Sequence, residues 1–395
     1  MTGVLKGIRV LDMSRFIAGP FCAALLADMG AEVIRLEPPG DTPDKSTGPF
    51  SPGGDDLRYC TVTRNKRAIT LDVTRREGKA LFRRLARACD VIVENFPHSA
   101  RVKMGLTYPH LRRMNPRLVV VSISAFDMRG ANRDRIAFDF IVQAESGFMS
   151  FNGFPDDPPT RSQINWIDLG TGQYAAFGAA LALMRRGQTG RGSLVEASLM
   201  DTAVSYLGYQ GVVAEAATGV IRPRIGNNGY YFLGDVLPTR DGRVAIAAIG
   251  NPMWRRLAEM IGHTELTSDP RYREDPDRYE HRDTLVPLVQ QWLSSRTSEE
   301  ALSEARRHGV PCGIVRTVAD LLRDPSLAAG RMLKDLPLPG GGRLPHAYPA
   351  LRMNGSRGTV RSGAPRLGQH NGVVYRKLLG MTTADLRRLR KKGIV

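Results

Sequence analysis

Residues 7–126 alternate between short apolar runs and amphipathic runs, and this alternation restricts the possible folds more than any other feature of the chain. The apolar runs are hydrophobic throughout, as is expected of strands that are covered on both faces. Strands that alternate with helices favour a parallel α/β sheet. The predicted strands are 7–14, 31–38, 68–74, 90–96 and 118–126, and the predicted helices are 18–30, 76–89 and 108–116.

The character of the sequence changes after residue 224. Two apolar runs flank the turn TRDGR, which indicates a hairpin, and amphipathic helices follow it. We therefore expect an α/β fold in which a parallel-sheet, Rossmann-like large domain is accompanied by a smaller α+β domain. The expected boundaries are 1–198 and 346–395 for the large domain, which the apolar C-terminal tail completes, 225–323 for the small domain, and 199–224 and 324–345 for linkers.

The chain of 395 residues carries a net charge of +17. A basic protein attracts anions such as nucleic acid, a membrane surface or a phosphorylated cofactor. The basic residues are scattered and form no long run, and no recognised nucleic-acid-binding module is present, so a nucleic-acid-binding protein stays only as the alternative from another class. We expect no nucleic-acid partner and no membrane partner, because the apolar stretches are too short to span a bilayer.

The four cysteines are far apart and form no CxxC pair. The beginning of the chain also lacks the charged start, apolar middle and small-residue end of a signal peptide. Both features indicate reduced thiols in a cytoplasmic protein.

Most motifs that suggest a cofactor lack the context they need. GTGQYA at 170–175 matches a dinucleotide fingerprint, but polar residues precede it where an apolar strand is required. The sequence contains no P-loop, no G-x-S-x-G and no clustered His or Cys ligands, so we expect no metal site. GNNG at 226–229 is typical of a tight turn, or of a mobile loop whose backbone N–H groups cover a reacting oxyanion.

Asp168 stands alone at the start of a long segment of small, almost uncharged residues, and the next charges are Arg185 and Arg186. One interpretation is a helix N-cap, because Asp is favoured at that position. The other is an acid that is held for chemistry. Local sequence leaves both open.

Several long segments of the chain form an ordered set. It begins with LKGIRVLDMSRFIAGPFCAALLADMGAEVIRLEPPGD and continues with NKRAITLDVTRREGKALFRRLARACDVIVENF, MGLTYPHLRRMNPRLVVVSISAF and TGRGSLVEASLMDTAV. HGVPCGIVRTVADLLRDPSLAAGRM and RLGQH with LRKKGIV follow. In this order they resemble class III coenzyme A transferases of the CaiB/BaiF family over nearly the whole chain.

The resemblance implies a CoA transferase that moves coenzyme A from an acyl-CoA thioester to a carboxylic acid. Asp168 matches the family's nucleophile, which attacks the thioester and carries the CoA as an aspartyl thioester. A carboxylate with a pKa of ~4 is already ionised at neutral pH, so no His base is required. Coenzyme A is a substrate here, and no tightly bound cofactor is expected. Gly226, Asn227, Asn228 and Gly229 form the oxyanion loop in this interpretation.

The resemblance also assigns the residues that contact CoA, although the identity of the acyl-CoA donor and of the acceptor acid stays open. Pro38 stands where some members have a basic residue, and Arg35 is the candidate substitute. Lys103 replaces an Arg that is frequent in the family, which removes a bidentate fork. The CoA-binding residues predicted in this way are Ala18, Leu71, Asp72, Val73, Thr74, Asn95, Phe96, Lys103 and Arg135.

Acyl-CoA racemases have the same fold and are the alternative within the family. They use a His about thirty positions before the catalytic Asp, and the pair exchanges a proton at the α-carbon. Counting back from Asp168 reaches Phe138, which cannot move a proton, with Asp139 as a helper near the nucleophile. The resemblance therefore favours the transferase, and it further implies an interlocked homodimer as the assembly.

Overall fold

The computed structural model describes residues 3–40, 42–326, 332–354 and 356–395, and the chain divides into two compact units. A short segment from the first half of the chain, residues 150–160, belongs to the second unit, and residues 199–221, expected as part of a linker, belong to the first. Part of the expected second linker, residues 327–331, lies outside the described residues. The first unit contains residues 3–149, 161–221 and 332–395, and the second contains 150–160 and 222–326.

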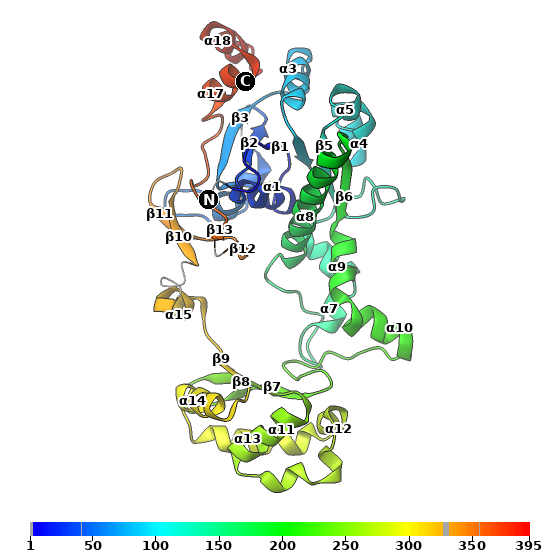
Figure 1. Cartoon of the computed structure of the whole chain (residues 1–395), viewed down its shortest axis with the longest axis vertical. Helices are drawn as coiled ribbons and strands as arrows, with labels where there is room; N and C mark the ends of the chain where they lie inside the picture. Colours follow the sequence, from blue (N-terminus) through cyan, green and yellow to red (C-terminus); the bar gives the residue numbers. More distant parts are fainter. Residues whose placement is uncertain (1–2, 41, 327–331, 355) are drawn as a thin grey trace. The chain divides into compact units, whose positions relative to one another are not determined.

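A six-stranded parallel sheet forms the centre of the first unit, with the strand order β3-β2-β1-β4-β5-β6 (Figure 1). This is the doubly wound order of Rossmann folds, which confirms the predicted fold class. The order reverses between β1 and β4, and ligands of such sheets bind beyond the carboxyl ends of the strands at that point. The strands are β1 (Arg9–Asp12), β2 (Glu32–Glu37), β3 (Lys66–Thr70), β4 (Val91–Glu94), β5 (Val119–Ser124) and β6 (Leu194–Ser198).

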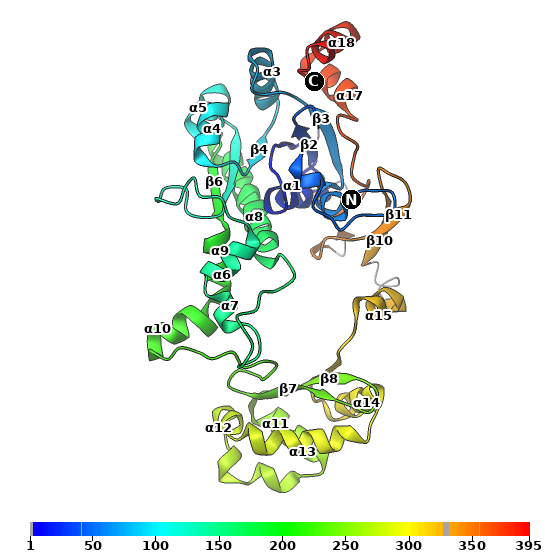
Figure 2. The ribbon, with the colours of Figure 1, turned by 180° about the vertical axis from the view of Figure 1, so that it is seen from behind.

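Helices cover both faces of this sheet (Figures 1 and 2). Val10 packs into one core and its neighbour Leu11 into the other, which explains why the strands carry apolar residues at successive positions. The face of Val10 is covered by α1 (Ala18–Asp28) and α8 (Trp166–Thr189). The face of Leu11 is covered by α3 (Arg76–Arg87), α5 (Tyr108–Met114), α17 (Asn371–Leu379) and α18 (Thr383–Lys391).

The C-terminal tail docks on the outer strand β3. The Thr70 N–H donates to the Asn371 side-chain oxygen at 2.8 Å, and the Tyr375 hydroxyl donates to the Thr70 carbonyl at 2.7 Å. Beyond the strand, the Asp72 N–H donates to the Ile394 carbonyl at 2.8 Å. The tail thus completes the large domain, as the sequence predicts.

The described parts of the two expected linkers contain regular secondary structure. Residues 199–224 are mostly helical because the Ser198 side chain caps α9 (Leu199–Leu207) and Ala203 is buried against the core. The Pro/Gly-rich stretch forms a hairpin of β10 (Leu333–Pro337) and β11 (Arg343–Ala347), in which Leu336 is buried. Burial of these side chains explains why neither segment is an irregular connection.

The second unit contains the antiparallel sheet β7-β8-β9, with β7 (Leu233–Pro238), β8 (Arg243–Ala248) and β9 (Cys312–Ile314). The turn TRDGR joins β7 to β8, as predicted. Trp254 and Tyr272 lie in the core beneath the sheet. The helices of this unit are α11 (Gly250–Ile261), α12 (Asp275–Glu280), α13 (Arg282–Ser294), α14 (Ser298–His308) and α15 (Val318–Arg323), with 3-10 turns at Thr264–Thr267 and Pro270–Tyr272.

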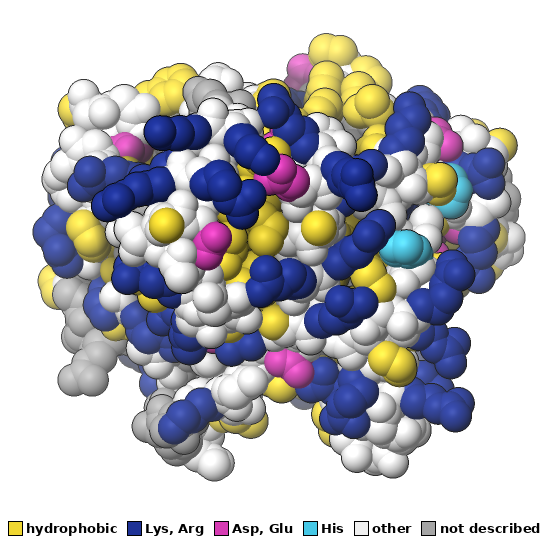
Figure 3. All heavy atoms as spheres, turned by 90° about the horizontal axis from the view of Figure 1, so that it is seen from above, with side chains coloured by type: hydrophobic (Ala, Val, Ile, Leu, Met, Phe, Trp, Pro, Cys, Tyr) yellow, Lys and Arg dark blue, Asp and Glu magenta, His cyan; other side chains and the backbone are white. Residues whose placement is uncertain are grey.

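The remaining elements are short. They are the 3-10 turn Pro43–Lys45, α2 (Leu57–Thr63), α4 (His98–Met104), α6 (Asp139–Glu145), α7 (Phe148–Phe151), the π-helical turn Tyr209–Val213, α10 (Ala214–Thr218), β12 (Arg352–Met353) and β13 (Ser356–Arg357). Within the described ranges, no helix combines the length and the hydrophobicity needed to cross a bilayer. Lys and Arg side chains are distributed over the whole of the face in Figure 3, with hydrophobic side chains between them.

Candidate active site

Asp168 is the third residue of α8 and is 8% exposed. The helix is capped by Asp139 of α6 rather than by Asp168. The Asp139 carboxylate accepts the backbone N–H groups of Ile167 at 2.9 Å and of Asp168 at 3.1 Å. The side chain of Asn165, at the N-cap position, makes no capping bond. Because Asp139 caps the helix, the interpretation of Asp168 as the N-cap is excluded.

Burial raises the pKa of Asp168 to about 7, and the negative charge of Asp139 adds to the rise. The positive charge of Arg58 opposes it. The expectation of an ordinary carboxyl pKa near ~4 is therefore wrong for this residue, because the sequence does not reveal how deeply the group is buried. Near neutral pH a substantial fraction of Asp168 is protonated, so its nucleophilic form is sensitive to pH.

Arg58, on α2, is a residue that the sequence did not single out. Its guanidinium lies 5.9 Å from the ring centre of Phe16 and donates to the Asp44 carbonyl at 3.0 Å. Asp56 lies 3.6 Å away, and the buried Nε has no partner among the described residues. Arg58 and Asp168 are 110 residues apart in the sequence, and neither belongs to a local motif with the other. No sequence signal could therefore have indicated that Arg58 acts on Asp168.

A cavity of about 290 Å³ opens in front of Asp168, at the carboxyl ends of β4 and β5. It brings together four of the predicted CoA-binding residues with the predicted nucleophile. Phe138 also lines it, and its ring lies 5.0 Å from that of Phe16 in an edge-to-face contact. The predicted residues on this cavity are Ala18, Asn95, Phe96, Arg135 and Asp168.

The loop after β1 is held in place by Asn95. The side chain of Asn95 accepts the Arg15 N–H at 2.8 Å and donates to the Arg15 carbonyl at 2.8 Å. The next residue, Phe16, has a positive φ of 64°, which is uncommon for a residue with a side chain. Both hydrogen-bonding groups of the Asn95 amide are therefore occupied by the backbone, and Asn95 shapes the wall of the cavity.

A second cavity, of about 160 Å³, shares Arg15 and Phe96 with the first. It is lined mainly by apolar atoms and by the segment Leu71, Asp72, Val73 and Thr74. The Asp72 carboxylate accepts the Thr74 N–H at 2.9 Å and fixes this turn. Two adjoining cavities, one remote and one at the carboxylate, suit a long substrate with a flat nucleotide at one end and a reactive group at the other.

Two predicted cationic contacts do not present a free charge to these two cavities. Arg35 lines the second cavity, but its guanidinium is 2.6 Å from Asp44 and 3.5 Å from Asp12, and the side chain is 2% exposed. Because these carboxylates already neutralise it, Arg35 is a structural cation and not a free phosphate ligand. Lys103 lines neither cavity and lies on another one with Lys79 and Arg83, so its contact with CoA stays a prediction.

Comparison with known proteins identifies the family of this chain. The family model described as CoA-transferase family III matches residues 5–371. The chain belongs to this family. A succinyl-CoA–D-citramalate CoA-transferase of Chloroflexus aurantiacus is 34% identical over 395 residues, which cover 99% of this chain and 98% of that protein. An acetyl-CoA:oxalate CoA-transferase of Acetobacter aceti is 34% identical over 378 residues, with 95% of each chain covered.

A crystal structure of a CaiB/BaiF family protein from Brucella suis has the same fold. It is 30% identical, with a TM-score of 0.83, and the match covers 96% of this chain and 100% of that one. The protein is therefore a family III CoA-transferase, and the resemblance seen in the sequence is confirmed.

In this CoA-transferase the predicted oxyanion loop belongs to the second unit, and most of its N–H groups are already bonded. Gly226 donates to Gly153 at 3.0 Å, Asn228 to Ile225 at 3.2 Å, and Gly229 to Gly234 at 2.7 Å. Among the described residues, the Asn227 N–H alone in this loop has no backbone acceptor. In this conformation one backbone N–H group of the loop, rather than four, is available to bind an oxyanion.

No group of three or more His, Cys, Asp or Glu side chains in the described part of the transferase is arranged to hold a metal ion.

Proposed function

We propose that this CoA-transferase moves CoA from an acyl-CoA thioester to a carboxylic acid through a covalent intermediate on Asp168. The observation that carries the proposal is the place of this side chain. Asp168 is the one carboxylate on the cavity in front of it, among the residues that the structure describes. The other charged residues on that cavity are arginines, at positions 15, 133 and 135.

The steps balance without an added acid or base. An Asp168 oxygen attacks the thioester carbonyl, which forms a mixed anhydride and releases CoA thiolate. The thiolate attacks the Asp168 carbonyl, which forms an aspartyl-CoA thioester and frees the donor acid. The acceptor carboxylate then attacks this thioester, and the thiolate released attacks the acceptor carbonyl, which yields the new acyl-CoA and restores Asp168.

The surroundings of Asp168 suit this relay. Low exposure removes water that would hydrolyse the anhydride, and the same burial raises the energy of the attacking carboxylate. Arg58 keeps the ionised form accessible by opposing the effect of burial.

Chemical trapping tests the intermediate. The enzyme is incubated with acyl-CoA and then with hydroxylamine, and its peptides are analysed by mass spectrometry. We expect a hydroxamate on Asp168 and no labelling of Asp139, which is also buried but is occupied in capping α8. Asp168→Ala should lose transfer while keeping the wild-type circular dichroism spectrum. Transfer that survives in Asp168→Ala would rule out the relay.

We propose a small dicarboxylic acid as the acceptor. The two relatives named above act, by their names, on succinyl-CoA with D-citramalate and on acetyl-CoA with oxalate. In this chain, Arg15 and Arg133 on the Asp168 cavity are cations that suit a second carboxylate. A panel of acyl-CoA donors and mono- and dicarboxylic acceptors, followed by mass spectrometry, tests this. A uniform preference for monocarboxylic acceptors would contradict it.

We also propose that the protein is an interlocked homodimer. The supporting observation is an apolar stripe along the outer face of α8. Its members recur every three or four residues, so they share one side of the helix, and all are solvent-exposed in the single chain. They are Tyr174 (44% exposed), Phe177 (62%), Leu181 (47%) and Met184 (67%).

The mass measured by light scattering across a dilution series tests the assembly. An interlocked dimer should keep its mass at every dilution, because its subunits separate only with partial unfolding. Phe177→Asp should reduce the yield of folded dimer, whereas Thr189→Asp, at the end of the same helix, should not. A folded, active monomer on dilution would rule out interlocking while leaving the transfer chemistry unaffected.

A cytoplasmic location is proposed as well. Its support is that all four cysteines are free thiols.

A further inference from the structure

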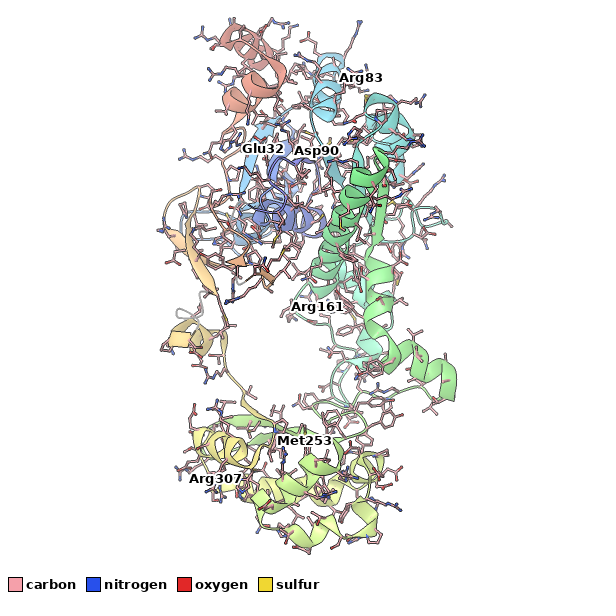
Figure 4. All side chains as sticks on the ribbon, in the orientation of Figure 1. Glu32, Arg83, Asp90, Arg161, Met253 and Arg307 are labelled. Atoms are coloured by element: carbon pink, nitrogen blue, oxygen red, sulfur yellow. The ribbon has the colours of Figure 1, made fainter. Side chains whose placement is uncertain are left out.

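A larger cavity, of about 640 Å³, lies at the opposite end of the parallel sheet from Asp168. Its floor contains the first residue of β2, Glu32, and the first residues of β3, Lys66 and Arg67. The Asp168 cavity lies instead at the carboxyl ends of β4 and β5. Figure 4 shows Glu32 and Asp90 at the same end of the sheet, where β2 and β4 begin. The larger cavity therefore cannot be part of the CoA path described above.

The charge on this cavity is strongly one-sided. Four cationic side chains line it, against the single carboxylate of Glu32. The Lys66 ammonium is excluded from this count, because it is turned away and bonds Asp12 at 2.8 Å. The four cations are Arg67, Arg361, Arg366 and Lys377.

Glu32 does not neutralise these cations. Its single carboxylate is bonded by three cations: Arg9 at 3.0 Å, Arg67 at 2.8 Å and Lys377 at 3.4 Å. One negative charge cannot neutralise three positive ones. The Arg366 guanidinium forms no hydrogen bond or ion pair with any residue in the described ranges. Several positive charges around one concavity repel one another, and a bound anion relieves that repulsion.

His370 adds a directed donor to the cavity. Its Nδ1 accepts the Ala68 N–H at 3.1 Å, so in the neutral ring the proton is on Nε2. The ring lines the cavity beside Arg67 and Arg366. A neutral imidazole with a fixed tautomer can donate to an oxyanion without being protonated first.

One part of the lining is apolar and closely packed. It consists of Pro337, Leu338 and Pro339, and Gly363 lies against it. A Cβ on Gly363 would be 2.0 Å from the Pro337 carbonyl oxygen, so only glycine allows the C-terminal segment to pass this close. Cationic side chains together with proline rings in one lining give a site for a ligand that has both phosphates and a flat apolar part.

We propose that this cavity is a second ligand site, separate from the CoA site, for a small molecule that carries two or more phosphate groups, such as a nucleoside diphosphate. The volume lies within the range of about 300–1,000 Å³ that is usual for ligand pockets. The arginine forks match phosphate oxygens, and the proline wall accommodates a base. The proposal does not depend on the transfer chemistry, because no residue of the Asp168 cavity takes part.

Calorimetric titration tests the site. Enzyme saturated with CoA is titrated separately with inorganic pyrophosphate and with ADP, so that the CoA site is filled in advance. We expect one equivalent of either ligand to bind per chain, with ADP tighter than pyrophosphate because of the proline wall. CoA alone, titrated first, should bind with one equivalent per chain, so that saturation with CoA leaves this cavity empty.

Three variants locate the binding. Arg366→Gln and Lys377→Gln, both at exposed positions, should each weaken pyrophosphate binding by about tenfold, because each removes a charge-assisted hydrogen bond. Arg87→Gln, on the exposed face of α3, makes the same change of charge away from the cavity and should leave binding within about twofold. Circular dichroism and thermal unfolding confirm that each variant is folded.

Three results would overturn the proposal. They are no heat with either ligand, equal affinity of wild type and the two cavity variants, and loss of binding in proportion to CoA occupancy. The last result would assign the phosphates to the CoA site instead. Since transfer activity is not the readout, failure here leaves the proposed relay on Asp168 standing.

Discussion

The carboxylate of Asp139 accepts the backbone N–H of Asp168 at 3.1 Å, so one buried acid holds the helix that carries the other. Asp139 is 1% exposed, and α6 places it against the first turn of α8. The same contact has two effects. It fixes where the Asp168 side chain begins, and it brings a negative charge close enough to favour the protonated form of Asp168.

The first prediction concerns the pH dependence of transfer. The ionised form of Asp168 is the nucleophile, and its pKa is raised to about 7, so kcat/KM for the acyl-CoA should rise with pH through that value. Asp139→Asn removes the neighbouring negative charge and should move the midpoint to lower pH. The amide still caps α8 but loses the bond from Gln143, so some stability is lost as well. An unchanged midpoint in this variant would show that Asp139 does not influence Asp168.

The second prediction concerns stability. The pKa of Asp168 is raised in the folded state, so below about pH 4 the group is protonated in the folded protein and does not lower the free energy of unfolding. As the pH rises through about 7, the buried group ionises and the free energy of unfolding falls. Asp168→Asn keeps a neutral side chain at every pH. Its free energy of unfolding should equal that of wild type near pH 4 and exceed it at pH 8, by at most about 4 kcal/mol. Urea unfolding at both pH values measures this, and a variant less stable at pH 8 would contradict it.

The third prediction concerns Asn95. Asn95→Ala removes both bonds to Arg15 and frees the loop that carries Phe16 and leads to Ala18, the first residue of α1. The KM for acyl-CoA should rise by about tenfold with a smaller change in kcat, because the loop contributes to binding rather than to the reacting bond. Asn115→Ala is the matched control. The Asn115 amide also donates one hydrogen bond to the backbone and accepts another from it, but Asn115 lies outside the two CoA-path cavities. Equal effects of the two changes would refute a special role for Asn95.

The fourth prediction compares two glycines of α8. A Cβ at Gly172 would lie 2.7 Å from the Ala18 carbonyl oxygen, whereas nothing lies within 4 Å of a Cβ at Gly187. Gly172→Ala should therefore push α1 away from α8 and destabilise the fold, by about 1–3 kcal/mol. Gly187→Ala should stabilise it by up to about 1 kcal/mol through helix propensity alone. The free energy of chemical unfolding of the two variants tests this. If Gly172→Ala were the more stable of the two, α1 and α8 would not be in close contact at this point.

The fifth prediction concerns the racemase alternative. Phe138 lines the Asp168 cavity, and a phenyl ring cannot carry a proton. Acyl-CoA incubated with enzyme in deuterated water should therefore gain no deuterium at its α-carbon at a rate comparable to transfer. Mass spectrometry of the recovered thioester measures this. Exchange that keeps pace with turnover would mean that another residue supplies the base.

The parallel sheet could be predicted because its information is local. Each strand is apolar at successive positions, as Val10 and Leu11 show by entering different cores, and the helices between the strands have their own periodicity. The position of Asp168 could be predicted from the order of the long segments around it. Both depend on residues that are neighbours in the sequence.

The environment of Asp168 could not be predicted in this way. The resemblance indicated that Asp139 lies near the nucleophile, but not that it caps α8, and nothing indicated Arg58. Both residues approach Asp168 through the packing of α6 and α2. The pKa depends on burial, which is a property of the whole unit. Segment 150–160 was missed for a similar reason, since it has no pattern of its own and joins the second unit through contacts such as Gly226 N–H to Gly153.

The docking of the tail on β3 has a consequence for how the protein is made. The partners of Thr70 are Asn371 and Tyr375, about three hundred residues further along the chain. While the ribosome is still translating the middle of the message, β3 is the edge of an incomplete sheet, with its hydrogen-bonding groups open to any other strand. A nascent chain stalled before residue 371 would thus be prone to pair with its neighbours on a polysome, and chaperones that cover strand edges should matter most during that interval.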